Sequence, residues 1–394
     1  MSDGSLKVGD AVTCVVDYDR RKLVVPNHTL THVLNYALRK VLLNGGDPDA
    51  EREGKLNQKG SDVNADRLRF DCAWDEALTP AQIVEVEAIV NQQVRDDYKV
   101  YDRVTPLDEA RAIFGLRAVF GETYPDPVRV VSIGADVDAV LADPRSEAWG
   151  GFSIEFCGGT HLASLGDAEL FVITDETSTA AGVRRITAVT RQRAKDTLAA
   201  GEGLQGSLKA LEGLPVGADL VSGVKALKKA LPTCGAGQAA RYAALERLAV
   251  LEKQGAEFTK AQAKEAEAAA LAAAAAVAAT LDAATAAKVV LRIDFGKDGK
   301  VNSAIMKLLS KKCKTGSFLV VSVNAADDQV CVFGASPAKG EGAIDALAWC
   351  AAALAPLGDA AKTGGKNMSA MGNAPGASRV DEVLAAAEAF KATL

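Results

Sequence analysis

The 394-residue sequence has only three histidines, few aromatic residues (5%), and seven scattered cysteines with no C-x-x-C pair. This odd, unpaired cysteine set argues against a disulfide framework and favours a reducing compartment, which we expect to be the cytoplasm. The polar start has no signal-like segment, and no apolar run approaches the roughly 20 residues that a membrane helix needs. A net charge of −6 excludes a globally basic surface, so any nucleic-acid contact must use local Lys and Arg clusters.

The hydrophobic pattern predicts an α+β protein of two or three domains, because the chain is too long for one ordinary core. Residues 12–17 and 23–25 are predicted to form two short strands that end at Pro26. Apolar residues then recur at helical spacing from residue 28 to about 43, after an N-cap at Asn27 and before Gly45-Gly46. Further helices are expected at about 80–94 and 106–114, with buried strands at 128–133 and 170–174.

After Thr190 the composition of the chain changes, and Ala, Leu, Lys and Glu recur with helical periodicity. This pattern predicts a helical connector that ends in an alanine-rich arm, with breaks near 201–206, 215–217 and 232–237. From Lys288 onward a small α/β domain is expected. Its predicted strands are 289–295, 318–324 and 330–333, and its predicted helices are 303–309, 343–355 and 380–393.

All three histidines fall in two short motifs together with one cysteine. The first motif, H-T-L-T-H, places His28 and His32 one helical turn apart on the same face. The second motif, C-G-G-T-H, supplies Cys157 and His161 from a tight glycine loop. Three imidazoles and a thiolate are ligands that suit zinc, so the sequence predicts one zinc ion bound by these four residues.

These motifs also allow other interpretations. An H-x3-H pair alone is more often ordinary helix surface, so the prediction depends on the two motifs together. A closed, purely structural zinc site stays an alternative, because four protein ligands leave no open coordination position. A zinc protease of the H-E-x-x-H type is excluded, since Thr29 stands where that motif needs a glutamate. The backbone N–H groups of Gly158 and Gly159 could also receive an oxyanion.

At these motifs the sequence resembles the editing domain shared by alanyl-tRNA synthetases and freestanding alanyl-tRNA editing proteins. Five motifs occur in the family's order: H-T-L-T-H (28–32), Q-K-G-S (58–61), R-L-R-F-D (67–71), C-G-G-T-H (157–161) and G-V-R-R-I-T-A-V-T (182–190). Residues 116–134 are similar to the eukaryotic-type branch. The glycine-rich segment 364–366, Ala370 and the final helix resemble the family's C-terminal tRNA-binding domain, although Met371 stands where the family usually has glutamine.

This resemblance implies a domain organisation of four parts. They are a partial β-barrel remnant (1–25), a zinc-dependent editing domain with helices on an antiparallel sheet (26–192), a helical connector (193–285) and a C-terminal tRNA-binding or dimerisation domain (286–394). Only some 27 residues precede His28, so we expect the class II aminoacylation domain and ATP binding to be missing. The chain would then be a freestanding editing protein or a piece of a synthetase.

The implied reaction is hydrolysis in trans of the ester in seryl- or glycyl-tRNA for alanine. Zinc would either bind the substrate or activate a water molecule, and the sequence does not choose between these. The candidate catalytic residues are Gln58, Thr29 and Thr31, with a structural hydrogen bond as the alternative for each of them.

The resemblance also implies tRNA as partner, bound through basic clusters that would otherwise be solvated surface. These clusters contain Arg184, Arg185, the run Arg191, Arg193 and Lys195, and the C-terminal lysines Lys307, Lys311, Lys312 and Lys314. The runner-up function is a non-catalytic, zinc-stabilised module for tRNA binding or dimerisation. A third possibility is a fragment that shares the name of alanine–tRNA ligase without charging tRNA. The C-terminal region could support a homodimer.

Overall fold

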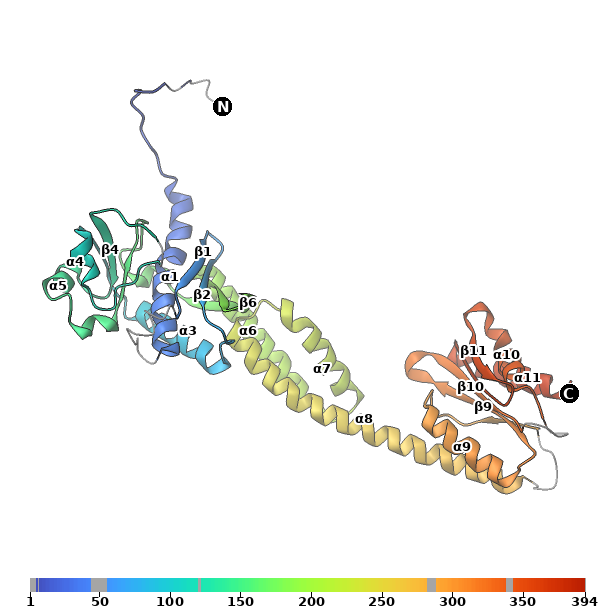
Figure 1. The fold of residues 1–394 in the computed structure, drawn as a ribbon. Helices are drawn as coiled ribbons and strands as arrows, with labels where there is room; N and C mark the ends of the chain where they lie inside the picture. Colours follow the sequence, from blue (N-terminus) through green and yellow to red (C-terminus); the bar gives the residue numbers. More distant parts are fainter. Residues whose placement is uncertain are drawn as a thin grey trace. The chain divides into compact units, whose positions relative to one another are not determined.

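A computed structural model describes residues 5, 7–43, 55–119, 122–281, 288–337 and 343–393. The chain divides into two compact units, Met1–Gly255 and Ala256–Leu394, and the long helix α8 (Gln238–Thr280) contributes residues to both (Figure 1). The four-part organisation expected from the sequence, with boundaries at 25, 192 and 285, stays a prediction.

Two antiparallel sheets form the first unit together with its helices. One sheet has four strands in the order β1-β2-β7-β6, and the other has three in the order β3-β4-β5. The elements in chain order are α1 (Tyr18–Leu42), β1 (Gln58–Val63), β2 (Leu68–Ala73), α3 (Pro80–Arg95), β3 (Val100–Thr105), α4 (Leu107–Arg111), β4 (Val128–Ile133), α5 (Val137–Ala142), β5 (Ser153–Phe156), β6 (Phe171–Ala180), β7 (Val183–Thr190), α6 (Arg191–Glu212) and α7 (Ala218–Ala230).

The main core of this unit lies between α1, α3 and the four-stranded sheet. Leu30, Leu34 and Leu38 recur at helical spacing on α1 and are completely buried. They pack with Phe70 of β2 and Ile83 of α3, whose first turn is closed by a capping box at Thr79 and Gln82. Figure 1 shows α1 running beside β1 and β2. The packing fixes one face of α1 in the core and leaves an adjacent face for a site.

The start of α1 differs from the sequence prediction. Residues 12–17 form no strand, and residues 23–25 are helical, so the predicted partial β-barrel strands are wrong for this structure. A strand needs a hydrogen-bonded neighbour, and the described residues provide none for this segment. The Gly45-Gly46 stop that was predicted for this helix falls outside the described residues.

Pro26 lies inside α1 instead of ending a strand. A proline has no N–H, so the carbonyl four residues earlier, that of Lys22, loses its helical donor. The Nη1 of Arg191 donates to this carbonyl at 2.9 Å and replaces the missing bond. Asn27, the predicted N-cap, is buried and instead links α1 to Asn64 and Thr190. A contact distant in sequence therefore allows the helix to continue through the proline.

The predicted break at residues 201–206 is also absent, because α6 is continuous across three glycines. A Cβ on Gly201 would lie 3.3 Å from the Cβ of Ala240 in α8, so the small residue permits a close approach of the two helices. The breaks expected near 215–217 and 232–237 do separate helices.

The second unit contains a five-stranded sheet in the order β11-β12-β10-β9-β8, in which β8 and β9 are parallel and the other pairs are antiparallel. Its elements are β8 (Lys288–Arg292), α9 (Gly299–Lys312), β9 (Ser317–Asn324), β10 (Gln329–Ala335), α10 (Ala346–Leu354), β11 (Lys362–Lys366), β12 (Ser369–Pro375) and α11 (Val380–Ala392). Alternate residues of β9 face two cores. Leu319 and Val321 meet α10 and α11, while Phe318 and Val320 meet α9 and alanines of α8 such as Ala274.

The prediction of an α+β protein with antiparallel sheets is confirmed, and most of the predicted elements occur within a few residues of their expected limits. Within the described part of the chain, no helix has both the length and the apolar character that crossing a bilayer requires. All seven cysteines lie among the described residues, and none of them forms a disulfide.

Candidate metal centre

Helix α1 presents His28 and His32 on the face that borders its core-facing leucines. The two imidazole rings are 5.5 Å apart between centroids, as expected for residues one turn apart. His32 is buried and His28 is half-buried. The helix is held rigidly by its buried apolar face, so it supplies two ligands at a fixed separation.

The loop that follows β5 carries Cys157 and His161 to the same place. The guanidinium of Arg129 on β4 donates through Nη1 to the carbonyls of Cys157, at 3.1 Å, and Gly159. Arg21 of α1 donates to the hydroxyl and the carbonyl of Thr160 at 2.6 and 2.8 Å. Two arginines from separate elements thus fix the course of this loop.

Gly159 is required by how closely this loop approaches α1. A Cβ at this position would lie 2.3 Å from Cε1 of His28, whereas a Cβ at Gly158 would meet nothing within 4 Å. The N–H of Gly159 donates to the sulfur of Cys157 at 3.4 Å. This N–H therefore supports the thiolate, so the oxyanion role considered for it would compete with an existing bond.

The four predicted ligands meet, and their donor atoms all lie within 4.8 Å of one another. The Nε2 atoms of His28 and His161 lie 3.6 and 3.4 Å from the sulfur of Cys157. A tetrahedral zinc ion with a Zn–S bond of about 2.3 Å and Zn–N bonds of about 2.0 Å would separate sulfur from nitrogen by about 3.5 Å. The observed spacing therefore fits a zinc ion of this coordination.

The second nitrogen of each imidazole has its own protein partner. Nδ1 of His28 donates to the carbonyl of Thr160 at 3.0 Å, and Nδ1 of His161 lies 3.4 Å from the hydroxyl of Thr29. Nδ1 of His32 binds the carboxylate of Glu155. Nε2 of His32 is buried and makes no hydrogen bond to any described residue. Partners on Nδ1 with Nε2 aimed at a common centre are typical of metal-binding histidines.

The electrostatics also suit a cation. Burial raises the pKa of Cys157, but the imidazoles of the three histidines outweigh it and hold this pKa at about 3. Burial lowers the pKa of His32, while Glu155 and Cys157 raise it to about 10. Burial lowers the pKa of His161. The thiolate and the carboxylate thus concentrate negative charge on two sides of His32, which favours a divalent cation at Nε2.

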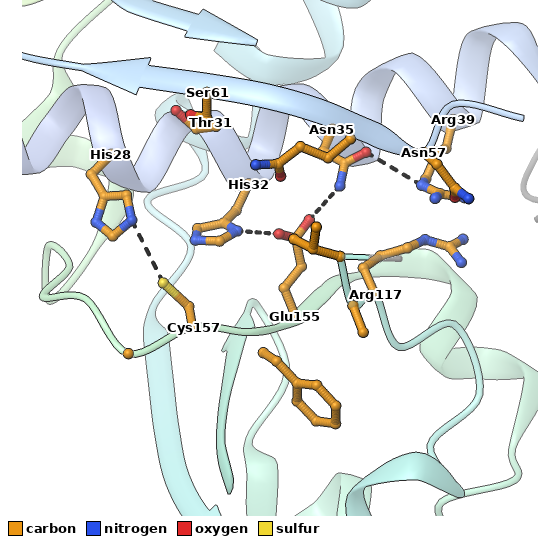
Figure 2. A pocket seen from close by; sticks show the side chains of 15 residues that line it. His28, Thr31, His32, Asn35, Arg39, Asn57, Ser61, Arg117, Glu155 and Cys157 are labelled. Carbon is orange, nitrogen blue, oxygen red and sulfur yellow. Dashed lines mark hydrogen bonds and ion pairs between the residues drawn. The ribbon is translucent and has the colours of Figure 1, made fainter. Parts of the chain in front are cut away.

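A cavity of about 300 Å³ opens beside three of the ligands, His28, His32 and Cys157 (Figure 2). Most of its other walls are polar. They are formed by Thr31, Asn35, Arg39, Asn57, Gln58, Ser61, Arg117, Ala118, Val119, Glu155, Phe156 and Gly158. A cavity of this size holds a small organic group, and a set of convergent polar side chains is typical of a binding or active site.

The candidate catalytic residues occupy different places. Gln58, at the start of β1, lines the cavity. Thr31 also lines it, but its hydroxyl donates to the carbonyl of Asn27 at 2.8 Å, so it can only accept from a ligand. Thr29 is completely buried, and its hydroxyl accepts from the N–H of Leu162 at 3.0 Å. The same hydroxyl lies beside Nδ1 of His161, and Thr29 is not among the residues that line the cavity.

The two candidate arginines of β7 lie in ion pairs. Arg184 pairs with the buried Glu176, and Arg185 binds both carboxylate oxygens of Asp71, at 2.8 and 2.7 Å. Both guanidinium groups thus stabilise the four-stranded sheet, and a phosphate would compete with these carboxylates.

Other predicted basic residues also have partners in the first unit. Arg191 contacts two carbonyls, Arg193 pairs with Asp66, and Lys195 pairs with Glu169. In the second unit, the four candidate lysines lie exposed on α9 and just after it; they are Lys307, Lys311, Lys312 and Lys314.

The sequence analysis did not identify the residues that support the ligands, among them Glu155, Asn35 and Arg129. A signal for Glu155 was present, because an acidic residue in the short apolar strand Ser153–Phe156 has to find a partner. The others come from elements whose contacts depend on the tertiary fold.

Comparison with known proteins defines the class of this site. Residues 128–187 match the family described as the threonyl and alanyl tRNA synthetase second additional domain. This match includes Cys157 and His161, whereas the two ligands on α1 precede it.

The chain as a whole is similar to alanine–tRNA ligases. It is 46% identical to the cytoplasmic enzyme of Dictyostelium discoideum over 194 residues, which cover 49% of this chain and 20% of the relative. It is 42% identical to the enzyme of Candida albicans over 263 residues (67% and 26%) and 32% identical to the cytoplasmic enzyme of Drosophila melanogaster over 395 residues (98% and 40%).

Residues 128–187 therefore carry a domain of this family, and the similarity of the chain to part of the alanine–tRNA ligases confirms the resemblance found in the sequence. It spans between one fifth and two fifths of the length of these three relatives.

Proposed function

We propose that this chain hydrolyses the ester of seryl- or glycyl-tRNA for alanine, in trans, at a zinc centre made by His28, His32, Cys157 and His161. The observation that carries the proposal is the convergence of four donor atoms beside a polar cavity of about 300 Å³, in a chain related to alanine–tRNA ligases. Such an activity answers a general problem. A pocket for alanine rejects glycine and serine only weakly, because they differ from it by one methyl or one hydroxyl group.

The donor set fits zinc by its chemistry and spacing. When bound, zinc would supply a Lewis acid that either holds the substrate's amino or hydroxyl group or lowers the pKa of a water molecule. The three Nδ1 contacts hold the imidazole rings in place, so little reorganisation is needed during the reaction.

The cavity walls would orient the ester. Gln58 is our candidate for direct contact, because its amide can donate to the ester carbonyl and accept from a water molecule. Thr31 would accept from a seryl hydroxyl or amino group. Thr29 would not contact the substrate and would act by orienting the ligand His161. Replacing Gln58 with Ala should lower kcat/KM by about tenfold while zinc content is retained.

Transfer RNA would contact the lysines on and after α9. These lysines are exposed and form no ion pair with any residue that the structure describes, so they can neutralise phosphates without first breaking such a pair. Binding should weaken steeply as salt rises, since each phosphate contact releases counterions. A binding constant that does not change between 50 and 200 mM salt would contradict this part of the proposal.

We also propose a cytoplasmic location and a homodimer formed through the C-terminal region. Fractionation of cells and the mass of the purified protein in solution test these two.

One observation favours the runner-up, a non-catalytic zinc-stabilised module that binds tRNA. The donor set offers four protein ligands, and a zinc ion that keeps all four has no open position for substrate or water. Catalysis through the metal would need one ligand to move aside.

The test is deacylation of serine-mischarged alanine tRNA by the purified chain, with zinc measured in the same samples. The variant Cys157→Ala removes the thiolate ligand, and Cys14→Ala is the matched control because Cys14 is an exposed free thiol that is not among the four predicted ligands. Rapid hydrolysis by the parent and by Cys14→Ala, with loss in Cys157→Ala, supports the proposal. Bound zinc without hydrolysis favours the tRNA-binding module. ATP-dependent charging of tRNA by this chain would overturn the proposal.

A further inference from the structure

Glu155 is a buried carboxylate beside the metal centre, and its two neighbours in sequence, Ile154 and Phe156, are apolar. It lies on β5 with 8% of its surface exposed. Burying a carboxylate is costly unless its oxygens are hydrogen-bonded. Both oxygens have partners, because Oε2 binds Nδ1 of His32 and Oε1 accepts from Nδ2 of Asn35 at 2.7 Å (Figure 2). The position of this carboxylate is therefore well defined.

Among the three histidines of the centre, His32 is the one whose Nδ1 partner is charged. The corresponding partners of His28 and His161 are a carbonyl and a hydroxyl. A carboxylate on Nδ1 fixes the ring orientation and makes Nε2 a stronger donor to a metal. Nε2 of His32 is also the buried nitrogen that has no hydrogen bond to any described residue. The charged contact, from Glu155, therefore acts on His32, the buried ligand of the centre.

Asn35 and Ser153 brace this contact from two elements. Asn35 is one turn after His32 on α1, so the ligand and the residue that holds Glu155 share a helix face. Ser153 on β5 donates to the carbonyl of His32 at 3.2 Å. These bonds join α1 to β5, so the distance between the ligand and the carboxylate is set by two packed elements rather than by a loop.

We propose that Glu155 is the positioning residue of the metal centre: held by Asn35, it orients His32 and sets the affinity of the site for zinc. This inference rests on the zinc-dependent function proposed above. Glu155 acts through His32 and forms no bond to the reacting ester.

The experiment measures the zinc dissociation constant by competition with a chromophoric chelator, for the parent, Glu155→Gln and Glu176→Gln. Glu176 is the matched control, because it is also a buried glutamate of the first unit but pairs with Arg184 on the four-stranded sheet. Glutamine keeps the volume and one acceptor and removes the charge. We expect Glu155→Gln to bind zinc about 10- to 100-fold more weakly, with Glu176→Gln within about twofold of the parent. Cobalt substitution gives a second measurement, in which the visible spectrum of Glu155→Gln should change and that of Glu176→Gln should not.

Asn35→Ala provides a second variant if Glu155→Gln does not fold, with an expected loss in zinc affinity of about threefold or more because Glu155 loses its brace. Parent-like zinc affinity in Glu155→Gln, or an equal loss in Glu176→Gln, would overturn the inference. The experiment distinguishes failure of this inference from failure of the proposed deacylase function. A parent that binds no zinc rejects the metal centre, whereas a parent that binds zinc without hydrolysing the ester leaves the role of Glu155 in zinc binding supported and rejects only the deacylase.

Discussion

Two cavities of the first unit have nearly equal volume and opposite chemistry. The cavity at the metal centre measures about 300 Å³, and the second, between α3, β6, α6 and the beginning of α8, measures about 340 Å³. The second is lined largely by apolar groups such as Leu170, Phe171 and Val172, with Glu87 and Asn91 among its polar members.

The difference lies in what the polar atoms of each cavity already do. In the second cavity, the Asn91 side chain donates to the carbonyl of Phe171 at 2.8 Å and accepts from its N–H at 2.9 Å, and Glu87 accepts from the N–H of Ile173 at 2.5 Å. These groups join α3 to β6. At the metal centre, the donor atoms of four side chains point at one another. A cavity of this size is therefore a candidate ligand-binding site only where several polar atoms converge and can still form bonds to a ligand.

The largest effect should come from filling the gap between the loop and α1. A Cβ at position 159 would collide with His28, so Gly159→Ala must displace this ligand. We expect zinc affinity to fall by more than about 100-fold and deacylation to be lost. Zinc titration of Gly159→Ala and Gly158→Ala checks this, because Gly158 has open space around it. Equal zinc affinities in the two variants would be incompatible with the geometry described.

The second cavity should respond to pH through stability alone. Burial raises the pKa of Glu87 to about 7 from its ordinary value of 4.5. The folded state then binds the proton more tightly than the unfolded state, so this stabilisation is complete below pH 4.5 and is lost as the pH rises to about 7. Relative to Glu87→Gln, the parent should lose about 3 kcal/mol of unfolding free energy over this range.

Denaturant unfolding of the parent and Glu87→Gln at pH 5 and pH 8 measures this difference. Zinc content and deacylation should be the same in the two proteins, because Glu87 contacts no ligand of the metal centre. A loss of zinc in Glu87→Gln would contradict the separation of the two cavities.

A smaller effect is expected from the arginine that holds the ligand loop. Arg129→Ala removes the donors to the carbonyls of Cys157 and Gly159, and zinc affinity should fall by about tenfold because the thiolate becomes less well placed. Arg103→Ala is the control, since Arg103 lies on the neighbouring strand β3 and pairs with the exposed Asp138. The comparison uses zinc dissociation constants, and a similar decrease in both variants would show that only general stability had changed.

The residues of the candidate metal centre could be grouped from the sequence because rare residue types were concentrated in two motifs. Three histidines and one cysteine needed no knowledge of the fold to be grouped, and the structure brings all four together. The helices and strands of both units were also predicted well where apolar periodicity was strong, as in α3 and β4.

The remaining features depend on contacts between distant residues. Pro26 looked like the end of a strand because its helical setting requires Arg191, which is far away in sequence. Gly201 looked like a helix break because its fit against Ala240 cannot be read from local pattern. Glu155 belongs to no recognised motif, and its proposed role follows from the bond between its carboxylate and Nδ1 of His32. Propensity gives way to tertiary contacts at each of these positions.

We expect one zinc ion to be bound by one thiolate and three imidazoles beside the polar cavity. X-ray absorption at the zinc edge of the purified chain, with the metal content measured in the same sample, tests it most directly. We expect about one zinc per chain, with one sulfur at about 2.3 Å and nitrogens at about 2.0 Å from the zinc. A zinc ion surrounded by oxygen alone, by several sulfurs, or no zinc at all would contradict it.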